Sequence, residues 1–295
     1  MSGLINKLGA YLGIGFLRLL ALLPLNWVRA AGWLVGNLLF WLIRSRRHVA
    51  TVNLTLCFPE LTNEQIRRLV RKNFIYYCQA LFDRGWLWHG SAAVTLKRLK
   101  ITGAVAEVQN DEPVVLFLPH FVGLDAANTA FTQQIQRKLI TIYTNQANKT
   151  MDAWILAGRG RFGNIRLFGR IAGVKEIVAA LRSGEMLGLL PDMNFGPEES
   201  VFVPFYGVQA CTVPSLSRFA RLGRAKVVPI LCRMTPDGYE VEILPAWQNF
   251  PTHDAVADTA LMNQWLEGYI NTMPAQYFWV HKRFKDRPAG EKSVY

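Results

Sequence analysis

A histidine and an aspartate stand five positions apart where an apolar run of the chain ends, in the segment Leu118-Pro119-His120-Phe121-Val122-Gly123-Leu124-Asp125. An imidazole held by a carboxylate can take a proton from a hydroxyl group, and such positioned proton transfer contributes roughly 100- to 10,000-fold in rate. His120 and Asp125 are therefore our candidate general base and its partner. The alternative is structural, because a histidine and an aspartate at this separation also occur as a buried core histidine and a helix cap.

The residues before His120 predict the strand that positions it. Val114 to Leu118 is too short for a typical helix and rich in β-forming residues, so we expect a buried strand that delivers His120 into the loop at its carboxyl end. Open α/β sheets bind ligands at that edge. Gly123 permits a turn, and the helix expected over Leu124 to Gln134 places Asp125 in its first turn. From there Asp125 can fold back toward the imidazole and fix its tautomer.

A second apolar run ends in the segment Leu190-Pro191-Asp192-Met193-Asn194-Phe195-Gly196. Asp192 should therefore lie at the same edge of the sheet as His120. We take Asp192 and Asn194 as candidates for contact with the substrate. A turn formed by the Pro-Asp pair is the alternative interpretation.

Arginines near the middle of the chain are candidate anion ligands. Residues 158–163 match a dinucleotide-binding fingerprint by letter, but they follow an expected helix and precede an expected strand, which reverses the order that this fingerprint requires. Guanidinium groups bind phosphate and carboxylate in a bidentate manner, so Arg159 and Arg161 suit an anionic substrate. They begin a cationic stretch that continues with Arg166, Arg170 and Lys175. A solvated basic face is the alternative.

Strand and helix candidates alternate along the chain after residue 90. The strands are expected over residues 94–101, 114–118, 139–143, 165–168, 186–190, 227–232 and 239–244. Such alternation predicts an α/β fold with a mixed, largely parallel sheet flanked by helices, in which the last two strands form an antiparallel hairpin. Before them, Thr62 to Gln65 forms a capping box that predicts the start of a helix.

The composition indicates a membrane surface as a partner. The 295 residues are 51% apolar and carry a net charge of +12, a combination that suits acidic headgroups. Nucleic acid would explain only the charge, so we expect no nucleic-acid partner. The apolar excess is concentrated in residues 1–45, which we expect to form a membrane anchor, and residues 46–295 should form one catalytic domain.

Two apolar runs make up the expected anchor, Leu8 to Leu25 and Trp27 to Ile43, and Arg18 and Arg29 interrupt them. We expect a single tilted transmembrane helix with Arg18 reaching toward an interface, in preference to a helical hairpin that lies in one leaflet. By the positive-inside rule, the arginines that follow put the body of the protein in the cytoplasm; they are Arg44, Arg46 and Arg47. No small-residue cleavage site follows the first run, so we expect no removed signal peptide.

Other chemistries lack their sequence signatures. The chain has no Gly-x-Ser-x-Gly elbow for a serine nucleophile and no P-loop for a nucleoside triphosphate. The four cysteines and five histidines have no metal-ligand spacing, so we expect reduced core cysteines, no metal centre and no cofactor. Direct transfer without a covalent acyl-enzyme remains, in which His120 deprotonates an acceptor hydroxyl that attacks an activated acyl group.

The order of these blocks resembles that of membrane-bound glycerolipid acyltransferases, with His120 and Asp125 followed by Ala157-Gly158-Arg159 and then Leu190-Pro191-Asp192. A narrower resemblance is to the late lipid A acyltransferases of Gram-negative bacteria, the lauroyl and myristoyl transferases. It rests on short motifs spread along the chain: Asn53-Leu54 with Cys57-Phe58-Pro59, Gly173-Val174-Lys175, Val203-Pro204-Phe205-Tyr206-Gly207, and Tyr277-Phe278-Trp279-Val280-His281-Lys282-Arg283-Phe284.

The narrower resemblance implies transfer of a fatty acyl chain from acyl carrier protein to the hydroxyl of a hydroxyacyl chain. The acceptor would be a Kdo-bearing, phosphorylated lipid A precursor at the bacterial inner membrane. His120 would be the general base, Asp125 would orient it, and Arg159 would bind a phosphate or polarise the thioester carbonyl. Many relatives carry glutamate at the position of Asp125, so acyl chain length and acceptor position cannot be taken from them. The rival hypotheses are another glycolipid or glycerolipid acceptor, and a non-catalytic lipid carrier.

Overall fold

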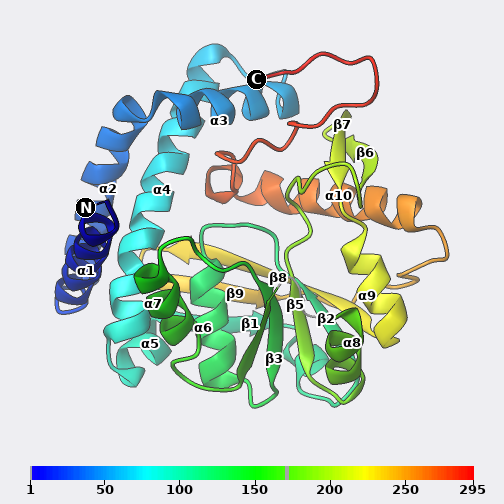
Figure 1. The fold of residues 1–295 in the computed structure, drawn as a ribbon, viewed down its shortest axis with the longest axis horizontal. Coiled ribbons are helices and arrows are strands. Elements are labelled where there is room, and N and C mark those ends of the chain that lie inside the picture. Colours follow the sequence, from blue (N-terminus) through cyan, green and yellow to red (C-terminus); the bar gives the residue numbers. More distant parts are fainter. Residues whose placement is uncertain (1, 170–172) are drawn as a thin grey trace.

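A seven-stranded sheet with helices on both faces forms the centre of the molecule (Figure 1). The structure is a computed structural model that describes residues 2–169 and 173–295. The strand order in the sheet is β1-β9-β8-β2-β5-β3-β4, and β6 and β7 form a separate hairpin. The strands are β1 (Leu99–Gly103), β2 (Val114–Phe117), β3 (Leu139–Tyr143), β4 (Ile165–Gly169), β5 (Met186–Leu189), β6 (Val201–Phe205), β7 (Val208–Thr212), β8 (Lys226–Thr235) and β9 (Gly238–Ile243).

The helices surround the sheet and extend along one side of it (Figure 1). In chain order they are α1 (Ser2–Leu20), α2 (Leu25–Leu42), α3 (Arg44–Cys57), α4 (Asn63–His89), α5 (Ala92–Arg98), α6 (Leu124–Gln134), α7 (Lys149–Arg159), α8 (Val174–Arg182), α9 (Ser215–Gly223) and α10 (Ala255–Thr272). Two short 3-10 turns, η1 (Val105–Val108) and η2 (Pro274–Gln276), complete the elements.

The directions of the strands confirm the predicted mixed, largely parallel sheet. The strands β8, β2, β5, β3 and β4 run parallel to one another, whereas β9 pairs antiparallel with β8, and β1 runs parallel to β9. The predicted hairpin of the last two strands is therefore confirmed. Parallel strands that are covered on both faces are apolar throughout. The four residues of β2 follow this rule, because none of them is exposed.

The β2 strand divides the core between two clusters. Val114 and Leu116 pack with residues of α6 and α7 on one face of the sheet. Val115 and Phe117 pack with residues of α8, α9 and α10 on the other face. Because successive side chains of a strand point to opposite faces, one short apolar run anchors both layers of helices.

Close backbone contacts dock α1 and α2 onto the long helix α4. A Cβ atom at Gly36 of α2 would overlap the backbone of Ile75 in α4, and one at Gly85 of α4 would overlap the carbonyl of Leu17 in α1. An ion pair reinforces the packing, since Arg29 of α2 binds the fully buried carboxylate of Asp83 with an N···O distance of 2.9 Å. The N-terminal helices are therefore packed against the body of the protein.

Asparagine side chains of α3 and α4 hold the segment that follows α10. Asn53 donates hydrogen bonds to the carbonyl groups of Trp279 and His281, each over 2.7 Å. Asn73 donates to the carbonyl of Tyr277 over 2.7 Å, and Phe121, next to His120 in the chain, forms an antiparallel bridge with Tyr277. The C-terminal motif thus lies beside the end of β2.

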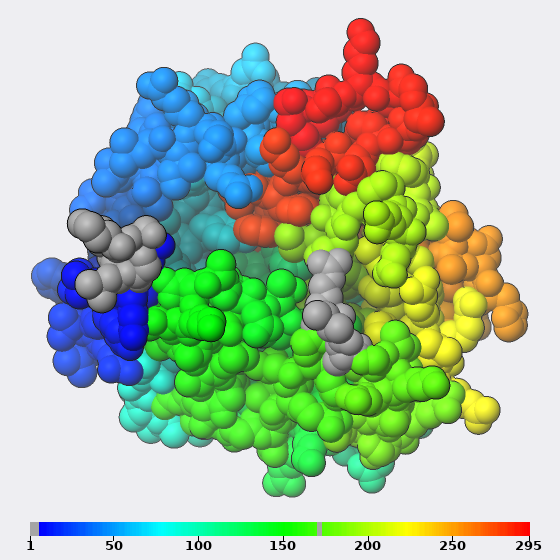
Figure 2. Space-filling view, viewed as in Figure 1, coloured from blue at the N-terminus to red at the C-terminus, as the bar shows by residue number. Residues whose placement is uncertain are grey.

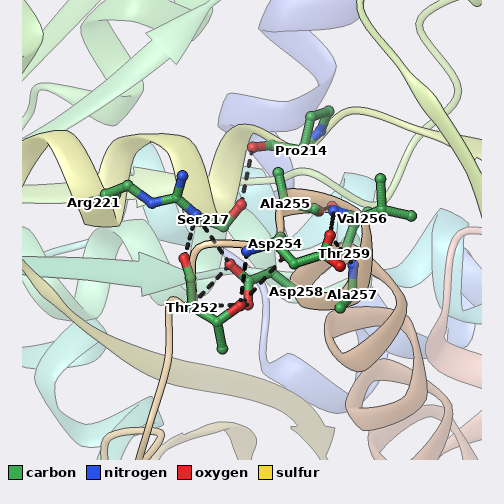
Figure 3. A network of polar contacts seen from close by, with 10 residues as sticks. All are labelled: Pro214, Ser217, Arg221, Thr252, Asp254, Ala255, Val256, Ala257, Asp258 and Thr259. Atoms are coloured by element: carbon green, nitrogen blue, oxygen red, sulfur yellow. Dashed lines mark hydrogen bonds and ion pairs between the residues drawn. The ribbon is translucent and has the colours of Figure 1, made fainter.

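A polar network fixes the start of α10 against α9 (Figure 3). Both carboxylate oxygens of the buried Asp258 accept from the backbone N–H of Thr252, and Asp254 caps the helix by accepting from Val256 and Ala257. Arg221 of α9 donates to the carbonyl of Thr252. The end of the loop that leads into α10 is therefore held against α9 and α10.

One local prediction is wrong, and one hairpin was not predicted. Residues 94–98 are helical, because Ser91 caps α5 by accepting from the N–H of Val94, and the strand begins only at Leu99. The hairpin of β6 and β7 was not expected. Its turn places Tyr206 and Gly207 at positive φ, and α10 stabilises this conformation through a hydrogen bond from the N–H of Tyr206 to Glu267.

The expected transmembrane helix is also wrong. Within the described parts of the chain, no helix combines the length and the apolar character needed to cross a membrane. The apolar residues are divided between α1 and α2, which are separated by a turn at residues 21–24. The expected boundary between an anchor and a catalytic domain at residue 45 stays a prediction.

Candidate active site

The register of two neighbouring strands brings His120 and Asp192 together. In the parallel pair of β2 and β5, Phe117 lies opposite Leu189. His120 and Asp192 each follow three residues later, and each comes directly after a Leu-Pro pair. Equal offsets from paired residues place the two side chains side by side at the carboxyl edge of the sheet, where the sequence predicted Asp192 to lie.

Both carboxylate oxygens of Asp192 form hydrogen bonds with His120. Oδ1 lies 2.7 Å from the imidazole Nδ1, and Oδ2 accepts from the backbone N–H of His120 over 2.9 Å. Burial alone would raise the pKa of Asp192, but the charge and the hydrogen bonds of His120 hold that pKa below its usual range. An ionised carboxylate can only accept, so Nδ1 carries the proton and Nε2 is left as the basic nitrogen.

Aromatic residues of the C-terminal motif form a wall beside the imidazole. Phe278 stacks on His120 with the ring centroids 5.9 Å apart, and His281 also stacks on Phe278, with a centroid distance of 6.3 Å. Burial, together with the nearby Arg283 and His120, lowers the pKa of His281 to about 4. His281 is therefore neutral at pH 7, and its Nε2 accepts from the N–H of Asn194 over 3.0 Å.

Asp125 has other partners than the expected one. It does lie in the first turn of α6, and that helix has the predicted bounds. Its carboxylate forms ion pairs with Arg84 at 2.7 Å and with Arg159 at 3.0 Å, and no hydrogen bond in the described parts of the chain joins it to His120. The prediction that Asp125 orients the imidazole is therefore corrected, because Asp192 does so.

Two guanidinium groups surround the Asp125 carboxylate. Burial would raise the pKa of Asp125, but the charges of Arg84 and Arg159 outweigh burial and lower that pKa to about 2. Both arginine side chains are 26% exposed, so part of each guanidinium group faces solvent. One carboxylate between two cations leaves a net positive charge, which suits an anionic or developing negative group of a substrate.

The remaining expected ligands have mainly structural contacts. Arg161 donates to the carbonyl groups of Leu87 and Gly90 at the end of α4, which is typical of a cation that caps a helix. Asn194 accepts from the N–H of Gly196 through its side-chain oxygen, while its buried side-chain nitrogen has no partner in the described residues. Farther along, Arg166 pairs with Glu185 on the surface, and Arg170 lies outside the described residues.

Tyr77 and Arg84 of α4 belong to this site, although no motif in the sequence pointed to them. Tyr77 packs against Phe278 with the ring centroids 5.2 Å apart. Burial and the charge of Asp192 raise the pKa of Tyr77, whereas the charge of Arg84 lowers it. Tyr77 therefore lies within electrostatic reach of both the His120–Asp192 pair and the Arg84–Asp125–Arg159 cluster.

Comparison with known proteins relates this chain to one family. The family model described as "Bacterial lipid A biosynthesis acyltransferase" matches residues 4–286. The chain belongs to this family. It is 33% identical over 291 residues to the lipid A biosynthesis lauroyltransferase of Escherichia coli (strain K12), covering 97% of this chain and 94% of that protein.

Other relatives extend this likeness. A lipid A biosynthesis acyltransferase of Haemophilus influenzae is 32% identical, over 96% of this chain and 89% of its own length. The lipid A biosynthesis palmitoleoyltransferase of E. coli is 30% identical, over 97% of this chain and 94% of its own length. Membership of the family makes the protein an acyltransferase of lipid A biosynthesis, as the resemblance implied.

A pair of variants separates the two carboxylates. In Asp192→Asn, the amide can no longer accept from both N–H groups of His120, so we expect kcat to fall by about 100-fold or more. The amide also no longer stabilises an imidazolium, so the acidic limb of the pH–rate profile should move to lower pH. In Asp125→Asn, the two arginines lose their shared partner, so the rate should fall without that movement. Steady-state kinetics across pH measures both effects, and a moved limb in Asp125→Asn alone would contradict the assignment.

Proposed function

We propose that this acyltransferase moves a fatty acyl chain from acyl carrier protein to the hydroxyl of a hydroxyacyl chain on a Kdo-bearing, phosphorylated lipid A precursor. The observation that carries the proposal is the His120–Asp192 pair in a member of the lipid A acyltransferase family. Its basic Nε2 has no hydrogen-bond partner among the described residues, so it is available to an acceptor hydroxyl. The acyl carrier protein conjugate is a second substrate, and no cofactor is needed for the chemistry.

The proposed reaction is direct transfer. Nε2 of His120 takes the hydroxyl proton while the oxygen attacks the thioester carbonyl carbon. The tetrahedral intermediate then collapses, the carbon–sulfur bond breaks, and the imidazolium returns its proton to the leaving thiolate, which gives an ester and the free thiol of the carrier. The ionised Asp192 stabilises the imidazolium between these two steps.

The arginine cluster has a separate part in the proposal. The exposed parts of Arg84 and Arg159 stabilise negative charge on the thioester oxygen or bind a phosphate of the acceptor. Asp125 holds these two side chains in place through its ion pairs, so it acts as a positioning residue. Asp192 is likewise a positioning residue, through His120.

Attachment to one leaflet of the inner membrane, on its cytoplasmic side, is part of the proposal. The support is a set of large apolar side chains on α1, α2 and the turn between them that are at least 43% exposed: Leu8, Tyr11, Leu12, Phe16, Leu19, Leu22, Leu23, Trp27, Trp33, Leu34, Leu38, Trp41 and Leu42. An exposed apolar face with interfacial tryptophans suits a helix lying in the headgroup region. The net charge of +12 suits both anionic lipids and an acidic carrier protein.

Mass spectrometry of lipid A tests the reaction in cells. We expect lipid A from a strain that lacks the gene to be lighter by one acyl chain, because the proposed reaction adds one chain. The wild-type gene should restore that mass, and so should the control His253→Ala, which changes an exposed histidine. The gene with His120→Ala should not restore it. Unchanged lipid A in the deletion strain would contradict the proposed acceptor.

Vesicle flotation tests the membrane surface. We expect replacement of Leu12, Leu19, Leu34 and Leu38 by serine to reduce binding to phosphatidylethanolamine–phosphatidylglycerol vesicles at least tenfold, because each leucine loses roughly 1 kcal/mol or more of transferable apolar area. Serine at Leu96, Val174 and Leu222, which are exposed elsewhere, is the control. An equal loss of vesicle binding in the α1–α2 variant and in the control variant would contradict attachment through α1 and α2.

A further inference from the structure

A groove between α1 and α7 has no part in the reaction described above. Its volume is about 1230 Å³, which exceeds the range of roughly 300–1,000 Å³ that is usual for small-molecule sites. In Figure 2, α1, in dark blue, lies beside the green segment of α7 at the left. The residues that line the groove are Asn6, Lys7, Tyr11, Ile14, Gly15, Arg18, Trp88, His89, Ala147, Asn148, Lys149, Thr150, Ala153, Trp154, Ala157 and Gly158.

The charge of the lining is positive. Lys7, Arg18 and Lys149 contribute three cations, the lining contains no carboxylate, and none of the three has an ion pair within residues 2–169 and 173–295. Asn148 and Lys149 also mark the first turn of α7, where the helix dipole favours an anion. Unpaired cations around a large groove are complementary to a phosphorylated ligand.

One wall of the groove is aromatic. Trp88 and Trp154 pack edge to face with the ring centroids 4.4 Å apart. Trp154 donates to His89 over 2.9 Å, and burial together with the nearby Arg18 lowers the pKa of His89, so this histidine is neutral. The indole N–H of Trp88, by contrast, is buried without a partner in the described residues. Trp88 and Trp154 are only 5% and 7% exposed, so the aromatic ring that a ligand in the groove can reach is that of Tyr11, which is 56% exposed. An exposed aromatic ring suits the C–H face of a sugar ring.

The groove lies between the catalytic cluster and the proposed membrane surface. At its inner end, Gly158 directly precedes Arg159, and Trp88 lies under the guanidinium group of Arg84 at 5.2 Å. Along α1, the groove is lined at helical spacing by Lys7, Tyr11, Ile14 and Arg18. The adjacent stripe, Leu8, Leu12, Phe16 and Leu19, is exposed. A ligand in the groove would thus lie at headgroup depth next to the catalytic site.

We propose that this groove binds the phosphate-bearing saccharide headgroup of the acceptor glycolipid. The inference rests on the proposed function, which supplies a phosphorylated glycolipid as the acceptor. Arg18 and Lys149 bind the phosphate, and the exposed ring of Tyr11 packs against the sugar rings. The phosphate of a bilayer phospholipid has the same chemistry, so the experiment has to distinguish these two sources.

The steady-state kinetics of the double variant Arg18→Gln/Lys149→Gln test the proposal. They are measured in detergent micelles, with the acyl carrier protein conjugate at saturating concentration. We expect KM for the phosphorylated acceptor to rise at least tenfold while kcat stays within about twofold of wild type. With an acceptor dephosphorylated beforehand, the variant and wild type should have equal KM values. The control is Lys72→Gln/Lys97→Gln, which removes two exposed lysines outside the groove and should leave both constants unchanged.

A binding measurement separates this inference from the proposed function. In the His120→Ala background, which does not turn over, the dissociation constant of the phosphorylated acceptor should rise at least tenfold on adding Arg18→Gln/Lys149→Gln. If wild type transfers no acyl chain to this acceptor and that rise is still found, the reaction assignment fails and the groove assignment stands. Unchanged KM and dissociation constants would overturn the inference. So would reduced vesicle binding with unchanged KM, which would assign the groove to bilayer phospholipid.

Discussion

The rest of the site depends on the contact between His120 and Asp192. It exists because β2 and β5 are neighbours in parallel register and end in the same way, with a Leu-Pro pair before the functional residue. The carboxylate is buried, accepts from both the backbone and the imidazole of His120, and stays ionised. One buried charge therefore fixes the position and the tautomer of the proposed base.

Around this pair, the fold uses two carboxylates for two tasks: Asp192 orients His120, and Asp125 positions two arginines. Asp125 is committed to Arg84 and Arg159, which keeps two cations together at the site without neutralising both. The C-terminal motif supplies the aromatic wall, and it is held there by asparagines of α3 and α4. The helices α1 and α2 dock on α4 through one face and expose apolar side chains on another, and this exposed face is the one that the proposed membrane attachment uses.

The sequence predicted the parts of this structure that depend on local pattern. The apolar runs gave the central strands, the bounds of α6 and the position of His120 at a strand end. It did not identify the partner of His120, because β2 and β5 are about 70 residues apart and their adjacency is a property of the whole sheet. The shared Leu-Pro pair was the available signal. Arg84 could not be picked out either, because it is one charged residue within a long helix. The apolar N-terminal runs likewise did not indicate that glycine contacts hold α1 and α2 on α4.

The protonation of His120 is the most direct test of the account. Nitrogen NMR of the protein labelled in its five histidines, with the His120 signals assigned from a His120→Gln variant, reports which ring nitrogen carries the proton. We predict that, at a pH where the ring is neutral, Nδ1 of His120 is protonated and Nε2 is not. Asp192→Asn should disturb this preference, and Asp125→Asn should leave it intact. A proton on Nε2 in the wild-type protein would contradict the assignment of His120 as a base oriented by Asp192.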